Sequence, residues 1–427
     1  MRDLLINGFK TTLYKTISAG LKLVLVLLIT NLFGADNYGA YTFAISVFLF
    51  LNTVFRFGFD IHLHKRIAEI SDGFNKITSQ KFFLRILLFT ILILFFVSIV
   101  IKIGLPFFAS LEFLNSKKYS YFNLLLIYSF VYAGFWLSVY YYRGLNKGIL
   151  SVLILEILFP VLNILLILLL NYLEYKPEFV LINSFGYSVT ICFISLLIID
   201  NLKLSFIWKH RFILADKFIC NEIKQSYPYL FISLSSMLLA WVDFYIISFF
   251  ETDSQLGIYS VTTRVALFLL FPASAISIFF SNKYLKLLKN NKNEEIRKLF
   301  IQITKILFAI SFSLFVFIAF FNKEILTLFG TEFVKGYKVL LILAFTHAVN
   351  ASFGLIETIL LMSDSKQILF KLNIITVGLN LIINIPLVYY YGLVGAAIGT
   401  FCVVMFNKVF QFYVINKRLI KIIDYKK

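Results

Sequence analysis

Long apolar stretches alternate with short polar segments along almost the whole chain. Each stretch has the length, roughly 20 residues, that a helix needs to cross about 30 Å of hydrocarbon. The stretches fall at residues 11–33, 38–58, 82–108, 121–142, 149–171, 178–200, 227–249, 256–280, 303–321, 337–361, 369–390 and 393–415. The pattern predicts an all-α polytopic membrane protein with about twelve transmembrane helices.

Basic residues are distributed unevenly between the two sets of loops that join these stretches. Most of the 40 Lys and Arg residues lie in the N-terminal segment, in alternate loops and in the C-terminal tail. The basic loops are 56–85, 143–147, 201–224, 281–305 and 362–371, and the tail is 417–427. Because cytoplasmic loops are enriched in Lys and Arg, both termini are expected to be cytoplasmic.

The composition agrees with a membrane protein and argues against other classes. The chain is 60% hydrophobic and 15% charged with a mean hydropathy of +0.89, whereas about a quarter of the residues of a soluble protein are charged. The net charge of +18 lies in loops and not on a soluble basic face, so no nucleic-acid partner is expected. The three cysteines and four histidines show no metal-ligand spacing, so neither a metal nor a cofactor is expected.

The longest basic loop divides the predicted helices into two sets of six. The sequence therefore predicts an N-terminal lobe at residues 1–200, a cytoplasmic linker at 201–226 and a C-terminal lobe at 227–427. One local repeat supports two related halves: GADNYGAY lies between the first and second stretches and runs into the second, and TDSQLGIY lies between the seventh and eighth and runs into the eighth. Lobes that both start and finish on the cytoplasmic side would be parallel repeats.

Several longer segments resemble a known family across nearly the whole chain. They are NLFGADNYGAY, RFGFDIHLHKRIAE, YYRGLNKG, LGIYSVTTR, ILTLFGTEFVKGYKVLLILA and LNLIINIPLVYYYGLVGAAIGT. In these segments the chain resembles the polysaccharide-exporter branch of the multidrug/oligosaccharidyl-lipid/polysaccharide (MOP) superfamily, particularly the O-antigen flippases. The resemblance implies a MATE-like two-lobed bundle in the bacterial inner membrane that flips undecaprenyl-diphosphate oligosaccharide from the cytoplasmic to the periplasmic leaflet.

Charged residues inside the predicted spans are candidates for function, whatever the family. A charge at mid-bilayer costs about 2.5 to 3.5 kcal/mol on insertion scales, so it usually faces a cavity or a partner. The residues concerned are Lys15, Lys22, Glu156, Asp243, Arg264, Glu357 and Lys408, with Arg56 and Asp60 at an inner membrane edge. Pro160 lies one turn after Glu156 and could open the backbone there.

Five residues are predicted to bind the diphosphate and glycan of the substrate: Lys15, Lys22, Arg56, Arg264 and Asn380. Ammonium and guanidinium groups suit phosphate oxygens, and polar helix faces suit sugars. Each assignment has a structural alternative. Lys15 could reach the headgroups, Arg56 could anchor its helix on the cytoplasmic side, and Asn380 could make an interhelical hydrogen bond.

Ion pairs are the alternative for the two remaining cations. Lys22 could pair with Asp243 or Glu357, and Arg264 could pair with Asp243 or Asp253. The acidic residues Glu156, Asp243 and Glu357 are in turn predicted to couple transport to a proton or sodium counter-ion.

Two other functions fit parts of the pattern. A drug/cation antiporter of the same superfamily would have an acidic cavity, whereas the seven charged residues singled out above within the spans comprise four basic and three acidic ones. A membrane polysaccharide polymerase or acyltransferase would need a large outer loop or a cluster of histidines, and the sequence has neither. The sequence therefore predicts a transporter and not an enzyme, with a polysaccharide polymerase as a possible partner.

Overall fold

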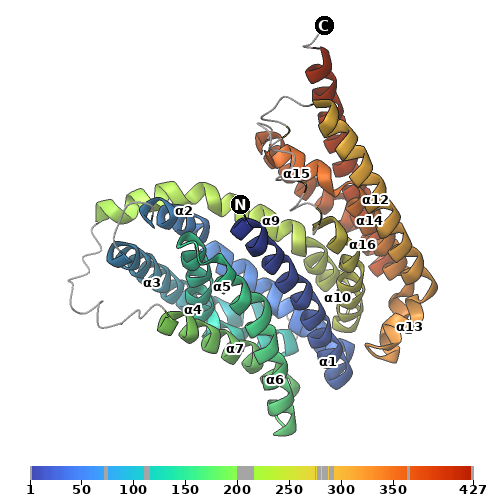
Figure 1. Cartoon of the computed structure of the whole chain (residues 1–427). Helices are drawn as coiled ribbons and strands as arrows, with labels where there is room; N and C mark the ends of the chain where they lie inside the picture. The colour runs from blue at the N-terminus through green and yellow to red at the C-terminus, as the bar shows by residue number, and fades with distance from the viewer. Residues whose placement is uncertain are drawn as a thin grey trace. The chain divides into compact units, whose positions relative to one another are not determined.

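The computed structural model describes residues 2–71, 76–109, 116–199, 216–274, 276, 280, 287, 293–362 and 366–424. In this part of the chain all regular structure is helical (Figure 1). The helices are α1 (Arg2–Phe55), α2 (Phe59–Ser71), α3 (Lys76–Ala109), α4 (Ser116–Gly144), α5 (Gly148–Leu153), η1 (Ile154–Leu158), α6 (Phe159–Tyr172), α7 (Pro177–Ile199), α9 (Asp216–Phe250), α10 (Asp253–Leu267), η2 (Phe268–Leu270), α12 (Asn293–Phe320), α13 (Asn322–Thr327), η3 (Thr331–Gly336), α14 (Tyr337–Ser352), α15 (Gly354–Met362) and α16 (Lys366–Asp424).

Among the described residues, nine helices are long and apolar enough to cross a membrane. The prediction of an all-α polytopic membrane protein is therefore confirmed. Two of the nine, Leu13–Phe55 and Ile374–Val414, are 43 and 41 residues long, about twice the length that one crossing needs. The tenth predicted span falls on α14 and α15, which are separated at Phe353. The count of twelve spans and the side on which the termini lie stay predictions.

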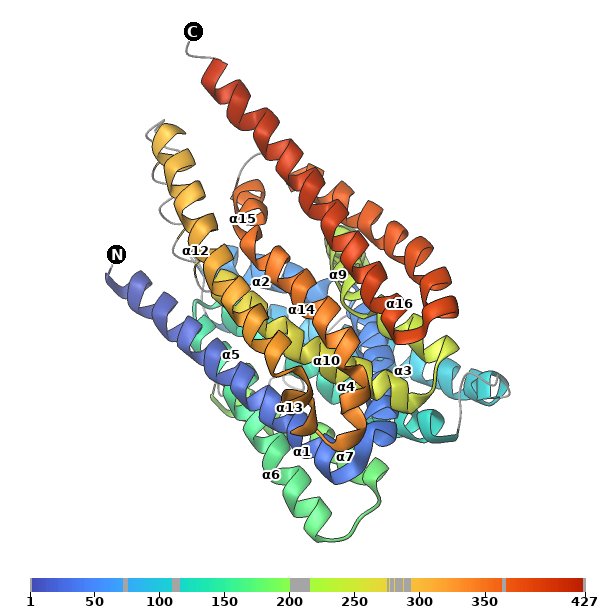
Figure 2. The same cartoon turned by 90° about the vertical axis from the view of Figure 1, so that its right-hand side faces the viewer.

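Glycine with positive φ interrupts each of the two longest helices. Gly34 has φ 75° and ψ 176° inside α1, and Gly392 has φ 54° and ψ −136° inside α16. Such backbone angles are open to glycine but strained for other residues. The breaks fall between predicted spans, and the two halves of α16 lie side by side (Figure 2).

The first compact unit comprises residues 1–33 and 40–237. In it α4 contacts α2, α3 and α7, and α6 packs along α7. Phe48 packs edge-on against Tyr132 and Phe185, with ring centroids 5.2 and 5.9 Å away. This aromatic core joins α1, α4 and α7.

The second compact unit comprises residues 34–39 and 238–427. Its α14 contacts α10, α12 and α16, and Figure 2 shows α14 between α12 and α16. The predicted lobes at 1–200 and 227–427 stay predictions, because most of the predicted linker lies outside the described residues.

The two copies of the sequence repeat cross one another within the second unit. A Cβ atom on Gly39 would collide with the carbonyl oxygen of Asp253, and one on Gly257 would collide with that of Ala35. Ala35 and Asp253 occupy matching positions, each four residues before its glycine. The repeat therefore marks a reciprocal close approach that only glycine permits.

Candidate functional site

A lysine and a glutamate from distant parts of the chain form an ion pair in the first unit. The Lys22 Nζ atom lies 2.6 Å from the Glu156 Oε2 atom, which also accepts a hydrogen bond of 2.6 Å from the Ser18 hydroxyl. The Lys22 side chain is 51% exposed and that of Glu156 only 18%. Lys15, also exposed, interacts electrostatically with Glu156 from the same helix. This cluster is a partly open basic face with one carboxylate.

The backbone at Glu156 is a π-helical turn, η1, between α5 and α6. The Phe159 N–H donates to the carbonyl oxygen of Ile154, five residues back, instead of four. Pro160 has no N–H to give to the Glu156 carbonyl, and its ring crowds that carbonyl. The predicted opening of the backbone is present, and such turns often occur at functional sites.

Arg56 is enclosed at the junction of α1, α2 and α4. It is 4% exposed, and its Nε atom lies 3.5 Å from the Asp60 Oδ2 atom. Its Nη2 atom donates to the Thr53 hydroxyl at 3.3 Å, and its guanidinium carbon lies 5.4 and 5.8 Å from the ring centroids of Trp136 and Tyr132. A substrate phosphate would have to displace these contacts, so the binding role of Arg56 stays a prediction that requires local opening.

Asp243 accepts hydrogen bonds from three neutral donors in the second unit. The Thr400 and Tyr259 hydroxyls donate to its Oδ2 atom at 2.8 and 3.2 Å, and the Asn384 amide donates to Oδ1 at 3.1 Å. The same amide nitrogen donates to the Oδ1 atom of Asn380 at 2.5 Å, and Asn380 is buried. Among the ion pairs of the described residues, none includes Asp243. The arrangement could hold a carboxylate with a proton or a small cation.

Arg264 and Glu357, the other predicted site residues of the second unit, take part in none of the ion pairs found among the described residues. The guanidinium of Arg264 lies 6.0 Å from the ring centroid of Tyr38, and the ion pairs found between described residues do not join it to Asp243 or Asp253. Glu357 is exposed on α15, where its charge acts on Lys408. Their predicted roles in substrate binding and ion coupling are not tested by these contacts.

A polar chain joins the two halves of α16 beyond the Asp243 network. The Asn407 amide donates to the Thr376 hydroxyl at 3.2 Å, and the Gln411 amide donates to the Asn407 Oδ1 atom at 2.7 Å. Lys408 Nζ lies 3.5 Å from Gln411 Oε1. Because side chains four apart share a helix face, the chain follows one buried seam between the halves.

One buried pair was not anticipated from the sequence. His62 Nε2 and Glu222 Oε2 are 2.5 Å apart, and each side chain is only 3% exposed. No local motif signals the pair, because α2 and α9 are far apart in sequence.

His64, two residues further along α2, faces outward. Partial burial and the nearby Arg143 guanidinium lower the pKa of its imidazole, so His64 favours the neutral form near pH 7.

Within the described residues, no three His, Cys, Asp or Glu side chains gather closely enough to hold a metal ion. The expected lack of a resident metal or cofactor stays a prediction. Each unit thus has one candidate site of ionisable side chains on apolar helices. In the first unit it is the partly exposed Lys22–Glu156 pair, and in the second it is Asp243 with its neutral hydrogen-bond donors.

Comparison with known proteins identifies the family to which the chain is similar. The sequence model of the family described as "Polysaccharide biosynthesis protein" matches residues 4–279. A probable low-salt glycan biosynthesis flippase, Agl15 of Haloferax volcanii, is 28% identical over 169 residues, which is 39% of this chain and 36% of the relative. The match thus spans little more than a third of that relative's length.

Two solved structures share the fold over most of their length. The lipid II flippase MurJ in an inward closed conformation gives a TM-score of 0.77 at 15% identity, covering 96% of this chain and 89% of MurJ. An inward-facing multidrug resistance MATE family transporter of the MOP superfamily gives 0.67 at 14% identity, covering 95% and 96%. The chain therefore shares its fold with MurJ and with a transporter described as a member of the MOP superfamily. Because the family model covers more than half of the sequence, the chain belongs to the polysaccharide biosynthesis protein family.

Proposed function

We propose that the protein is a flippase of the bacterial inner membrane. Its cargo is an undecaprenyl-diphosphate oligosaccharide, such as an O-antigen repeat unit, which it moves from the cytoplasmic to the periplasmic leaflet by alternating access. The observation that carries the proposal is the basic face of α1, where Lys15 and Lys22 are both exposed within an apolar helix. An exposed ammonium at that depth needs water or an anion, and the diphosphate of the proposed lipid-linked cargo is such an anion.

Glu156 gives this face a means of binding and release. While ionised, the Glu156 carboxylate neutralises Lys22. A diphosphate that enters must compete with this carboxylate for the Lys22 ammonium group. Protonation of Glu156 removes the competing charge and leaves Lys22 to pair with the cargo. The exchange links diphosphate binding to a proton, which is the coupling role proposed for Glu156.

Asp243 is proposed as a second coupling site, for a proton or a sodium ion. Its neutral hydrogen-bond partners Thr400, Tyr259 and Asn384 leave its charge without a cationic counterpart among the described ion pairs. A bound proton or sodium ion would supply that counterpart. Arg264 and Asn380 are proposed to contact the cargo, and Glu357 to take part in coupling.

The membrane potential favours the proposed direction of transport. Moving two negative charges outward across a membrane whose inner side is negative releases about 4.6 kcal/mol per 100 mV. A counter-ion moving inward would add to this energy. A polysaccharide polymerase is a proposed partner, because it would use the delivered lipid-linked unit.

A drug/cation antiporter is the second candidate, and the shared fold with a MATE transporter supports it. The exposed lysines of α1 count against a cationic cargo because they would repel it. An enzymatic role as a polymerase has no comparable support, since the matched relative and the two solved structures are described as flippases or transporters.

Proteoliposomes containing the purified protein test the proposal. We expect a fluorescent undecaprenyl-diphosphate oligosaccharide to change leaflets with the wild-type protein but not with Lys22→Ala or Arg264→Ala. In cells the same two variants should abolish surface polysaccharide at unchanged protein level, whereas Lys65→Ala, an exposed lysine on α2, should not. Wild-type glycan from both variants would refute the assigned roles, and drug resistance without any glycan effect would favour the antiporter.

A further inference from the structure

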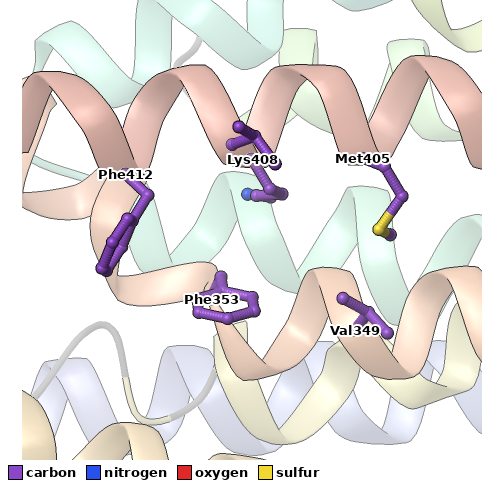
Figure 3. A pocket seen from close by; sticks show the side chains of 6 residues that line it. Val349, Phe353, Met405, Lys408 and Phe412 are labelled. Carbon is purple, nitrogen blue, oxygen red and sulfur yellow. The ribbon is translucent and has the colours of Figure 1, made fainter.

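A pocket in the second unit combines an apolar lining with one lysine. It has a volume of about 210 Å³ and lies between α14 and α16. Figure 3 shows side chains of α16 directed toward those of Val349 and Phe353. The lining residues are Val349, Phe353, Met405, Lys408, Val409 and Phe412.

The ammonium group of Lys408 is incompletely neutralised in this pocket. The residue is 8% exposed, and its hydrogen bond to the Gln411 side chain is long, at 3.5 Å. The ion pairs found in the described part of the chain do not include it, although the exposed carboxylate of Glu357 acts on it from further away. A buried ammonium is costly unless paired, so an anion in the pocket would be stabilised.

The mouth of the pocket is apolar and lies at a depth that lipid can reach. Val409 is 70% exposed and Phe412 is 47% exposed beside it. Lys408 lies seven residues from the predicted cytoplasmic end of the last span, about 10 Å along a helix that rises 1.5 Å per residue. The apolar mouth can accept a hydrocarbon chain at this depth. The long Lys408 side chain can extend toward the cytoplasmic interface, where an anionic headgroup can meet its ammonium group.

We propose that this pocket binds an anionic phospholipid of the cytoplasmic leaflet. One acyl chain packs on Phe353, Met405 and Phe412, and a phosphate oxygen accepts a hydrogen bond from Lys408 Nζ. A zwitterionic phospholipid carries its own ammonium, which competes for the phosphate, so the pocket selects an anionic headgroup. The site is independent of the proposed flippase function, because it requires neither the α1 face nor the cargo.

Native mass spectrometry of the full-length protein tests the site. Phosphatidylglycerol and phosphatidylethanolamine with identical acyl chains are titrated onto detergent-solubilised protein. We expect Lys408→Met to weaken phosphatidylglycerol binding about tenfold, which is the usual worth of a hydrogen bond to a charged group. Phosphatidylethanolamine binding should change less than twofold. The matched control is Lys371→Met, an exposed lysine on the same helix, which should leave both lipids unaffected.

A second variant tests the apolar part and guards against misfolding of the first. Val349→Phe fills the pocket without changing charge, so binding of phosphatidylglycerol should fall by a similar factor at an unchanged melting temperature. Equal phosphatidylglycerol binding by the wild type and both variants would overturn the site, as would an equal loss in Lys371→Met. Undecaprenyl phosphate that binds more tightly than phosphatidylglycerol, with the same dependence on Lys408, would assign the pocket to a cargo-type lipid and overturn the proposal too.

Discussion

The charged side chains within the apolar helices are neutralised to very different degrees. Arg56 is enclosed by Asp60, a hydroxyl and two aromatic rings, whereas Lys22 keeps half of its side chain exposed beside Glu156. A pair with one open side can exchange its carboxylate for another anion at modest cost, because the ammonium is never fully desolvated. The Lys22–Glu156 pair is therefore the site in the first unit that we propose for the diphosphate, because binding there would not require a helix contact to open.

Replacing Glu156 by glutamine tests this exchange. Glutamine keeps a hydrogen-bonding side chain but removes the charge that competes for Lys22, so diphosphate should bind about tenfold more tightly. Release should slow in proportion, and leaflet exchange with it. Titration calorimetry with inorganic diphosphate on the purified protein measures the affinity.

The control for this change is Glu69→Gln, a carboxylate that pairs with Arg66 on α2 outside the apolar helices. It should leave diphosphate affinity unchanged. Weaker binding in Glu156→Gln would show that the carboxylate organises the site and does not compete for it.

Replacing Asp243 by asparagine tests the coupling role in the second unit. Asparagine fills the same volume and can still accept from Thr400 and Tyr259, but it carries no charge to bind a proton or sodium ion. Leaflet exchange in proteoliposomes should lose its dependence on an imposed proton or sodium gradient, while cargo binding stays within twofold of wild type.

Glu251→Gln is the matched control for Asp243→Asn. Burial raises the pKa of the Glu251 carboxyl, which lies in the turn between α9 and α10, yet this group is outside the Asp243 network. Gradient dependence should survive in Glu251→Gln. If it also survives in Asp243→Asn, the coupling ion binds elsewhere.

The elements follow the apolar pattern closely, and their irregularities follow single residues. The predicted spans 11–33 and 38–58 fall on the two halves of α1, and 369–390 and 393–415 fall on those of α16. The backbone breaks at Gly34 and Gly392 lie in the short segments between these apolar stretches. The sequence also pointed to an opening at Pro160. It could not indicate that the opening would be a π turn, since proline is equally compatible with a simple kink.

Replacing Pro160 by alanine tests the link between this turn and the ion pair. Alanine restores an N–H that can bond four residues back, so η1 should relax toward a regular α-helix. Losing the extra residue per turn rotates Glu156 relative to α6 and away from Lys22. Cysteines introduced at Ser18 and Glu156 should therefore cross-link less efficiently when Pro160 is also replaced.

Pro177→Ala serves as the control, because Pro177 begins α7, where proline costs no helical hydrogen bond. Cross-linking should not change in that background. Unchanged cross-linking in Pro160→Ala would mean that packing against α1, and not the proline, maintains the turn.

For the molecule as a whole, the sequence indicated the fold but not which charged side chains pair with one another. Apolar length and the family segments identified a polytopic MOP-type bundle, and the candidate residues were found because charges in apolar spans are conspicuous. The partner of Lys22 was missed, since 134 residues separate it from Glu156 and only packing brings them together. The His62–Glu222 pair was missed for the same reason, and Thr400 because a hydroxyl in a span carries little signal.

The orientation of the chain in the membrane is a property of the whole molecule, and it sets which side of the membrane each loop and each end of α1 faces. The excess of Lys and Arg in alternate loops predicts that the turn at Asn146, between α4 and α5, is cytoplasmic, and that the turn at Glu174, between α6 and α7, is periplasmic. Both residues are exposed, so single cysteines placed there, after replacement of the three native cysteines, report the side directly. In cells with a permeabilised outer membrane only, a maleimide that cannot cross the inner membrane should label Glu174→Cys and not Asn146→Cys. Lysis should make both reactive. The opposite pattern would refute the predicted orientation, because it would place the end of α1 that carries Lys15 on the periplasmic side, away from the leaflet in which the proposed cargo is taken up.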